Sequence, residues 1–296
     1  MAAAAPEGRS RPVRIVSVQS WVAFGHVGNA AALFPLQRLG AEVLGVHTVQ
    51  FSNHPGHGGF GGAALPAAHI ASVLDGLAAR GFLDAVDGVL SGYLGEAETG
   101  APLLAALVRV RRANPAALYC CDPVIGDEGP GVYVRPGLPA FFAARAVPQA
   151  DLLTPNRFEL GLLAERQCGS LAETIEAGAA LRQRMRAAGP RIVLVSSLDA
   201  PGGDGIAMLL LAPAGRFLLR TPRLPITPNG AGDLLSALFL FHYLRTGDAC
   251  AALEEAGSSL FGLIAATAAA GARELALIAA QAEFLAPSRR FAAEPC

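Results

Sequence analysis

The sequence shows no marked excess of charge of either sign. Lysine and arginine together number 23, against 24 aspartates and glutamates. A surface that binds nucleic acid carries clustered basic charge, which this balanced composition does not suggest. We therefore expect no nucleic-acid partner.

The sequence also lacks CxxC motifs and long uninterrupted apolar segments. The five cysteines form no CxxC pair and are odd in number, which favours free thiols in a reducing cytoplasm. The histidines between residues 46 and 57 are too irregularly spaced for a zinc site. The most apolar late segment, 260–282, is interrupted by Arg273 and Glu274, so we expect no membrane span.

The length of the chain suits one large α/β domain, with two small domains as the alternative. Residues 1–12 are rich in Ala, Pro and Arg without a secretory apolar region, and we expect a disordered N-terminal tail. No repeat or composition change divides the remainder. Residues 13–288 are therefore predicted to form one domain, and residues 289–296 a C-terminal tail.

Continuous apolar segments alternate with segments of helical spacing. Strands are predicted at 13–19, 42–49, 88–91, 117–122 and 192–196, with a hairpin at 205–221. Helices are predicted at 29–39, 67–80, 99–112 and 171–188, and three more from residue 233 to about 285. This order predicts an α/β fold with a mainly parallel sheet and helices on both faces. Residues 51–62, rich in glycine and histidine, are predicted to be a mobile flap.

The segment 227–236, TPNGAGDLLS, contains a glycine turn that opens a helix. Such a turn leaves backbone N–H groups unpaired, which makes it a candidate anion site. Asp233 in the first helical turn would accept a proton from an alcohol, while the neighbouring amides hold a phosphoryl group. An ordinary turn with an acidic residue at a helix start explains the tetrapeptide equally well.

Other polar residues follow predicted strands, where ligands of parallel sheets bind. Asp122 comes directly after a buried strand and is a candidate magnesium ligand, with capping of a neighbouring loop as the alternative. Asn156 and Glu159 lie one helical turn apart, as in a capping box or at the edge of a metal site. Of the adjacent Cys120 and Cys121, one is expected to face the core and the other a helix layer or the pocket.

Together these motifs resemble the ribokinase superfamily, and within it the pyridoxal kinases. The superfamily pattern Gly-x-Gly-Asp matches Gly230 to Asp233, and Asn-x-x-Glu matches Asn156 to Glu159. The narrower resemblance to the vitamin-binding segments of pyridoxal kinases is carried by residues 18–29, 48–54, 91–95, 119–127 and 154–156.

This resemblance implies transfer of the γ-phosphoryl group of ATP to the 5′-hydroxymethyl group of pyridoxal, and of pyridoxine and pyridoxamine. Asp233 would be the base, with Gly230, Ala231 and Gly232 as the anion hole. Ser20 would bind the pyridine ring, in a pocket lined by Val27, Val49, Phe51, His54 and Tyr93. ATP and Mg²⁺ would face Asp122, Asp127, Thr154, Asn156, Glu159, Ser196, Leu224, Pro225, Ile226 and Thr227. The metal would lie nearest Asp122 and Glu159. A homodimer and a response to K⁺ are also implied.

Three departures from the family pattern affect the pocket. Trp21 and Pro55 stand where a histidine and a threonine are usual, and residues 223–230 form a shorter segment than in some bacterial members. One rival function is a hydroxymethylpyrimidine kinase of the same superfamily, which the residues around His54 and Tyr93 disfavour. The other is a non-catalytic vitamer-binding relative, which the retained Asp233 and its glycines disfavour.

Overall fold

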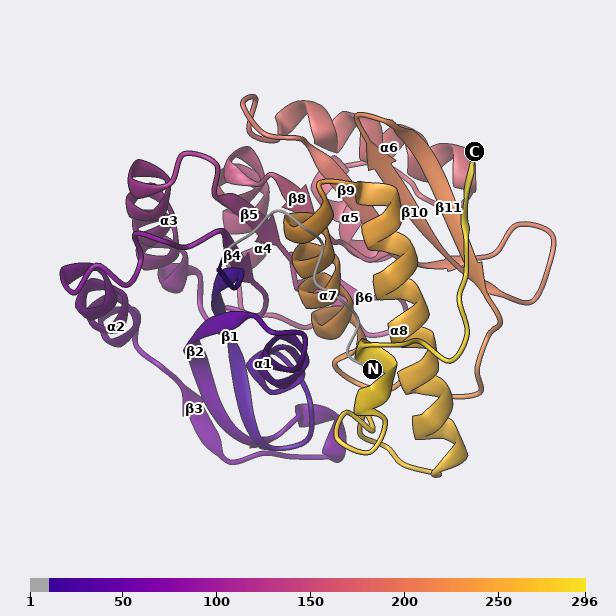
Figure 1. Ribbon diagram of the computed structural model, residues 1–296, viewed down its shortest axis with the longest axis horizontal. Coiled ribbons are helices and arrows are strands. Elements are labelled where there is room, and N and C mark those ends of the chain that lie inside the picture. The colour runs from indigo at the N-terminus through magenta and orange to yellow at the C-terminus, as the bar shows by residue number, and fades with distance from the viewer. Residues whose placement is uncertain (1–10) are drawn as a thin grey trace.

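The computed structural model describes residues 11–296. Most of the expected N-terminal tail therefore lies outside the described residues. Within the described part, Arg11 forms an ion pair with Asp87 at 2.8 Å. Figure 1 shows one central sheet between layers of helices, which confirms the α/β fold expected from the sequence.

The sheet has ten strands in the order β12-β11-β10-β9-β8-β5-β4-β1-β2-β3. The parallel part consists of β1 (Arg14–Phe24), β2 (Glu42–Asn53), β4 (Gly88–Ser91), β5 (Leu118–Cys121), β8 (Leu152–Leu153) and β9 (Ile192–Asp199). The antiparallel edges are formed by β3 (Gly62–Ala64), β10 (Ile206–Ala212), β11 (Gly215–Thr221) and β12 (Ala293–Pro295). The hairpin β10–β11 turns at residues 213 and 214, as the sequence predicted.

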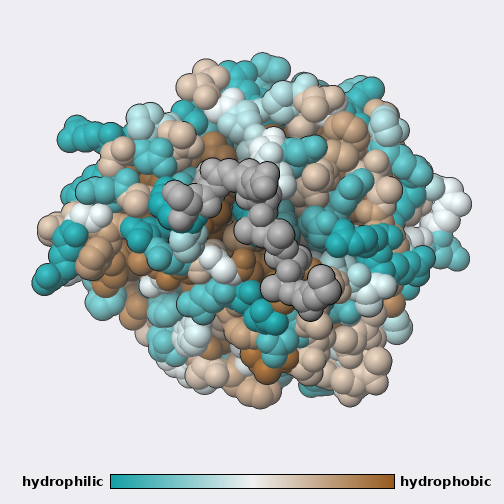
Figure 2. Space-filling model, in the orientation of Figure 1, coloured by the Kyte–Doolittle hydropathy of each residue, from teal (hydrophilic) through white to brown (hydrophobic). Residues whose placement is uncertain are grey.

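Helices cover both faces of the sheet. One face packs against α2 (Ala67–Ala79), α3 (Gly100–Ala113), α4 (Leu138–Phe141), α5 (Arg157–Ala164) and α6 (Leu171–Arg184). The other packs against α1 (Asn29–Arg38), α7 (Ala231–Thr246) and α8 (Ala249–Ala269). The third closing helix expected from the sequence is only a short 3-10 turn, Gln281–Phe284. On the face that carries α1, α7 and α8, polar and apolar residues are interspersed (Figure 2).

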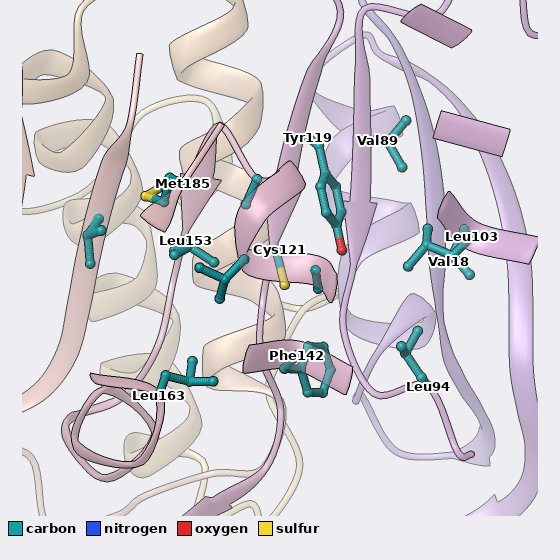
Figure 3. Close-up of a cluster of buried hydrophobic side chains, with 14 of the residues drawn as sticks. Val18, Val89, Leu94, Leu103, Tyr119, Cys121, Phe142, Leu153, Leu163 and Met185 are labelled. Carbon is teal, nitrogen blue, oxygen red and sulfur yellow. The ribbon is translucent and has the colours of Figure 1, made fainter. Parts of the chain in front are cut away.

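The two adjacent cysteines of β5 belong to opposite faces of the sheet. Cys121 lies with Tyr119 in the cluster beneath α3 to α6 (Figure 3), whereas Cys120 lies in the cluster beneath α7 and α8. Both thiols are fully buried. The Tyr119 hydroxyl is 2.8 Å from the hydroxyl of Ser91 on the neighbouring strand. Both cysteines are therefore packing residues, and neither reaches a surface.

Helix α8 is long and apolar enough to cross a membrane by length and composition alone. However, 56% of its apolar window is buried inside the fold. It packs against α7 and the strands β10 and β11. A core helix has this kind of burial, so α8 is weak support for a span.

The predicted flap is wrong in its first part. β1 and β2 continue beyond the rest of the sheet and remain paired, with Val22 opposite Phe51 and Phe24 opposite Asn53. This pairing satisfies backbone groups that a loop would expose to water. β3 then pairs back onto the end of β2. Only residues 54–61 connect the two strands, and this connection is called the flap below.

The predicted C-terminal tail, 289–296, is also corrected by the structure. Its residues Ala293–Pro295 form β12, which pairs with β11 in the register Leu218 with Glu294. The Ala293 amide also donates to the Glu254 carboxylate at 2.9 Å. Pairing of this kind covers a sheet edge that would otherwise present unsatisfied backbone groups.

Candidate active site

The amino end of α7 lies at the carboxyl ends of the parallel strands. Gly230 adopts the left-handed conformation, with φ 83°. A Cβ there would stand 1.8 Å from the His26 carbonyl oxygen, so only glycine fits. A Cβ on Gly232 would meet nothing within 4 Å, which shows that this turn faces open space. Within the described chain no side chain caps this end, so its first N–H groups are free to bind an anion.

Asp233 lies in the first turn of this helix and is partly exposed. Burial raises the pKa of its carboxyl to about 6, and a hydrogen bond from the Gly28 backbone opposes the shift. A general base works best when its pKa lies near the operating pH. The position and the pKa of Asp233 therefore suit it to accept a proton from an alcohol.

Asp122 follows β5 and is only 5% exposed. Its Oδ2 accepts a 3.0 Å hydrogen bond from the hydroxyl of Ser236 on α7. Burial raises the pKa of the Asp122 carboxyl well above its usual range, and the nearby charges of Asp233 and Glu159 raise it further. The structure thus brings Asp122 near Asp233 and Glu159, at the edge of the sheet where the parallel strands end; this edge is called the rim below.

Ser236 is a residue of this rim that sequence reasoning missed. Its hydroxyl lies 3.0 Å from Asp122, 2.8 Å from the Thr154 hydroxyl and 2.9 Å from the Gly232 carbonyl oxygen. One hydroxyl has a single proton, so Ser236 donates to one acceptor while accepting from another group. Its spacing of four residues from Gly232 was the available signal, because it places both on one helical face.

Asn156 and Glu159 form the capping box that the sequence allowed. The Asn156 side chain accepts from the Glu159 amide at 2.8 Å, and the Glu159 carboxylate accepts from the Asn156 amide at 3.0 Å. The other Glu159 oxygen accepts from the amides of Ile125 and Gly126 at 2.9 and 3.4 Å. Burial raises the pKa of Glu159 to about 7, and these amides oppose the shift.

These contacts fix the short hairpin of β6 (Gly126–Asp127) and β7 (Gly131–Val132), which follows Asp122. The Asn156 side chain donates to the Gly126 carbonyl at 2.8 Å. Asp127 is exposed and accepts from the Glu128 amide. Glu159 therefore fixes the position of the β6–β7 hairpin beside the site, and this structural role does not depend on its charge acting on a ligand.

The expected pyridoxal pocket lies where β1, β2 and β4 end. Ser20 is buried, and a Cβ on Gly28 would lie 2.2 Å from its Oγ. Thr48, within β2, donates to the Tyr93 carbonyl at 2.7 Å, which ties β2 to the segment that follows β4. Burial raises the pKa of the Tyr93 phenol.

The other residues expected to line the pocket lie on or beside β1 and β2 and in the flap. Val27 and Val49 are buried, whereas Phe51 packs its ring against Phe60 with 4.4 Å between centroids. His54 begins the flap, and burial lowers the pKa of its imidazole. It is therefore neutral at pH 7 and presents a flat ring without charge.

The residues expected to face ATP are only partly brought together. Ser196 donates its amide to the Pro155 carbonyl at 3.1 Å, beside Asn156. Residues 224–227 have no regular structure and lead directly into Gly230. In that segment Leu224 and Ile226 are partly buried, while Pro225 and Thr227 are exposed.

Positive charge is scarce at this rim. The sequence contains no lysine, so all 23 basic residues are arginines. Among residues 11–296, no arginine forms an ion pair with Asp122, Glu159 or Asp233. Nor do the described residues hold a compact group of three or more His, Cys, Asp or Glu side chains ready to bind a metal.

Comparison with known proteins places this site in a family. The family model described as phosphomethylpyrimidine kinase matches residues 70–276. The pyridoxal kinase PdxY of Granulibacter bethesdensis is 54% identical over 286 residues, which cover 96% of this chain and 100% of that protein. The pyridoxal kinase PdxY of Deinococcus radiodurans is also 54% identical, with 96% of each chain covered.

Solved structures agree with these relatives. Pyridoxal kinase from Leishmania donovani in complex with ADP and pyridoxamine superposes with a TM-score of 0.88 at 27% identity, covering 96% of this chain and 99% of that chain. Pyridoxal kinase from Trypanosoma brucei gives 0.83 at 27% identity, with the same coverage. The chain accordingly belongs to the pyridoxal kinase family.

Proposed function

We propose that this chain transfers the γ-phosphoryl group of ATP to the 5′-hydroxymethyl group of pyridoxal, and of pyridoxine and pyridoxamine. The observation that carries the proposal is Asp233, a carboxylate of pKa about 6 beside the uncapped amino end of α7. The relatives named pyridoxal kinase support the substrate, as do the Leishmania donovani complexes with ADP and pyridoxamine or pyridoxine.

Asp233 and the α7 amides divide the chemistry between them. As the 5′-oxygen bonds to the γ-phosphorus, its proton passes to Asp233, and the bond to the bridging oxygen breaks to leave ADP. The amides around Gly230, Ala231 and Gly232 stabilise the negative charge on the transferring group. Ser20 and Tyr93 orient the pyridine ring so that its hydroxymethyl group reaches Asp233.

The described residues offer magnesium one free buried carboxylate at the rim, Asp122, which suits an ion held mainly by the ATP phosphates. Asp122 is a buried carboxylate oxygen donor with no cation partner among the described residues, and carboxylates are preferred magnesium ligands. Asp122 would bind the ion directly. Glu159, whose oxygens accept hydrogen bonds from three backbone amides, would contribute only its negative charge nearby. Bound magnesium neutralises charge on the ATP phosphates. The chain has no lysine for this role, and the α7 amides would share it with magnesium.

ATP is proposed to lie along Thr154, Ser196, Asp127 and the segment 224–227, which precedes the anion hole. A homodimer, a cytoplasmic location and a response to K⁺ are further parts of the proposal. The free cysteines of the described chain are consistent with a reducing compartment. The size of the particle in solution tests the dimer, and activity with and without K⁺ tests the cation.

A second candidate function is phosphorylation of hydroxymethylpyrimidine. The description of the matching family model favours it, since that model covers residues 70–276. The 54% identity to proteins named pyridoxal kinase favours the first proposal.

The test is ADP formation with pyridoxal, pyridoxine, pyridoxamine and hydroxymethylpyrimidine in parallel, with the phosphorylated product identified by mass. We expect turnover with the B6 vitamers and little with the pyrimidine. Turnover of the pyrimidine alone would establish the second candidate. Vitamer binding without any turnover would establish a non-catalytic binding protein.

A further inference from the structure

Glu274 joins two segments that are far apart in the sequence. It follows α8, and its side chain is only 14% exposed. One carboxylate oxygen accepts from the His26 backbone N–H at 2.8 Å, and the other lies 2.7 Å from Nε2 of His57 in the flap. A Cβ on Gly25 would lie 2.4 Å from the same carboxylate, so the approach requires glycine there.

The first of these segments, residues 25–28, touches the catalytic turn directly. The His26 carbonyl oxygen is the atom that leaves room only for glycine at Gly230. At the other end of the segment, the Gly28 backbone lies near the Asp233 carboxyl and opposes the rise in its pKa. A shift of residues 25–28 would therefore move the partners of both the anion hole and the base.

The second segment, the flap, reaches the same turn from the other side. A Cβ on Gly56 would lie 3.5 Å from the side-chain nitrogen of Asn229, which precedes Gly230. The His57 ring, bonded to Glu274, also makes an edge-to-face contact with Phe24, with 5.9 Å between the ring centroids. The flap therefore has one polar anchor to the body of the protein at Glu274, in addition to contacts within the flap and its strands.

We propose that Glu274 is a positioning residue for phosphoryl transfer: its carboxylate holds residues 25–28 and the flap together over the amino end of α7. The inference rests on the proposed kinase function. A hydrogen bond to a charged, largely buried carboxylate is stronger than one between neutral groups, and so holds both segments in one geometry. Small displacements of groups around a reacting centre cost large factors in rate.

The experiment compares Glu274→Ala, Glu274→Gln and His57→Ala with a control, Glu294→Ala. Glu294 pairs with Arg220 on the exposed antiparallel edge of the sheet, away from the flap. For each variant, kcat and KM for pyridoxal, ATP hydrolysis without product, and hydrogen exchange of residues 25–28 and 54–61 are measured.

We expect Glu274→Ala to lower kcat/KM for pyridoxal by about 10- to 100-fold. ATP loss to water should increase, and exchange should rise in both segments. His57→Ala should raise exchange in the flap alone, and Glu274→Gln, which keeps an acceptor for His26, should have a smaller effect on residues 25–28. Glu294→Ala should match the wild type in every measurement.

Unchanged kinetics in Glu274→Ala, with or without faster exchange, would overturn the positioning role. Faster exchange in one segment only would overturn the claim that Glu274 couples the two. If Glu274→Ala does not fold, Glu274→Gln and His57→Ala decide the question by the same measurements. A wild-type protein without pyridoxal turnover would contradict the proposed function. The exchange data would still show whether Glu274 holds residues 25–28 and the flap together.

Discussion

Asp151 and Asp122 are both buried carboxylates of the central sheet, yet they lie at opposite ends of its strands. Asp151, at the amino end of β8, is 2.8 Å from Arg111, 2.7 Å from Arg186 and 2.8 Å from the Tyr119 amide. The side-chain carboxylate of Asp122, at the carboxyl end of β5, has only the hydroxyl of Ser236 as a hydrogen-bond partner among the described residues. The same kind of group is neutralised at one end and left without a cation at the other.

The contrast shows which buried carboxylate lacks a neutralising cation within the fold. A buried carboxylate is costly unless cations or N–H groups surround it, and Asp151 has two arginines for this purpose. Asp122 instead shares its rim with Asp233 and Glu159, and their mutual repulsion adds to the burial that raises its pKa. Charge that the fold does not compensate marks a functional site, because a ligand can compensate it.

Removing Asp233, the proposed base, should give the largest effect on rate at the uncompensated end. We expect Asp233→Asn to lower kcat by about 10²-fold or more, the usual scale for a general base. Binding of pyridoxal and ATP, measured by calorimetry, should change little because Asn keeps the shape of the site. A variant with near-normal turnover would show that another group takes the proton.

Removing charge at the compensated end should affect stability and leave the chemistry alone. Asp151→Asn leaves Arg111 and Arg186 together without their counter-ion, and breaking a buried pair costs about 3–5 kcal/mol. The measurement is denaturant unfolding at pH 7. The folded variant should keep its kcat, and a large fall in kcat would break the separation between the two ends.

The pH dependence of kcat should follow Asp233. With a pKa of about 6, Asp233 is protonated in acid and could not serve as the proposed base there. We expect kcat to fall about tenfold per pH unit below pH 6 and to level off above it. A profile that stays flat from pH 5 to pH 8 would contradict the assignment.

The contribution of these rim carboxyl groups to stability should change with pH in the opposite direction to kcat. The pKa values of Asp233 and Glu159 are raised to about 6 and about 7, above the value near 4 of an unfolded chain. The folded protein then binds more protons, so this contribution to the unfolding free energy is present in acid and lost as pH rises through these values. Asp233→Asn should therefore raise the unfolding free energy at pH 8 by about 1–2 kcal/mol.

The wild type is the reference for that measurement at each pH. Histidines such as His242, whose pKa burial lowers to about 4, act in the opposite direction. Because they are present in both proteins, the difference between variant and wild type isolates Asp233. A variant no more stable than wild type at pH 8 would show that Asp233 carries no burial cost.

Magnesium should distinguish the two other rim carboxylates. Asp122→Asn removes the oxygen donor that we propose for the ion, and should raise the magnesium concentration for half-maximal rate by about tenfold, the scale of one lost charge-assisted contact. Glu159→Gln should raise it less, because its oxygens are engaged by the amides of Ile125, Gly126 and Asn156. Equal titrations for both variants and wild type would place the metal elsewhere.

Local patterns were enough to predict much of this architecture. Alternating apolar segments gave the order of strands and helices, and the glycine turn gave the start of α7 at the rim. The capping box of Asn156 and Glu159 is a contact over three residues, so its spacing is visible in the sequence.

Contacts between distant residues could not be predicted in this way. The bond between Thr154 and Ser236 spans 82 residues, and that between His57 and Glu274 spans 217. β12 likewise pairs with a strand about 75 residues away, and the ends of β1 and β2 pair where their glycine-rich continuation suggested a loop. Each depends on the folded sheet, and no local propensity encodes it.

The smallest effect is expected from Ser236, the hydroxyl that links the rim. Ser236→Ala removes the hydrogen bond to Asp122 and the contacts with Thr154 and Gly232, but leaves every charged group in place. A typical hydrogen bond contributes about 1 kcal/mol, so kcat should fall by about 3- to 10-fold.

Because Ser236 is the only hydrogen-bond donor to the Asp122 carboxylate within the described chain, the apparent affinity for magnesium should change with kcat. Ser236→Thr restores the hydroxyl, and recovery of both values would attribute the loss to that group. A Ser236→Ala protein with unchanged kcat and magnesium dependence would show that Asp122 and the turn at Gly232 act independently.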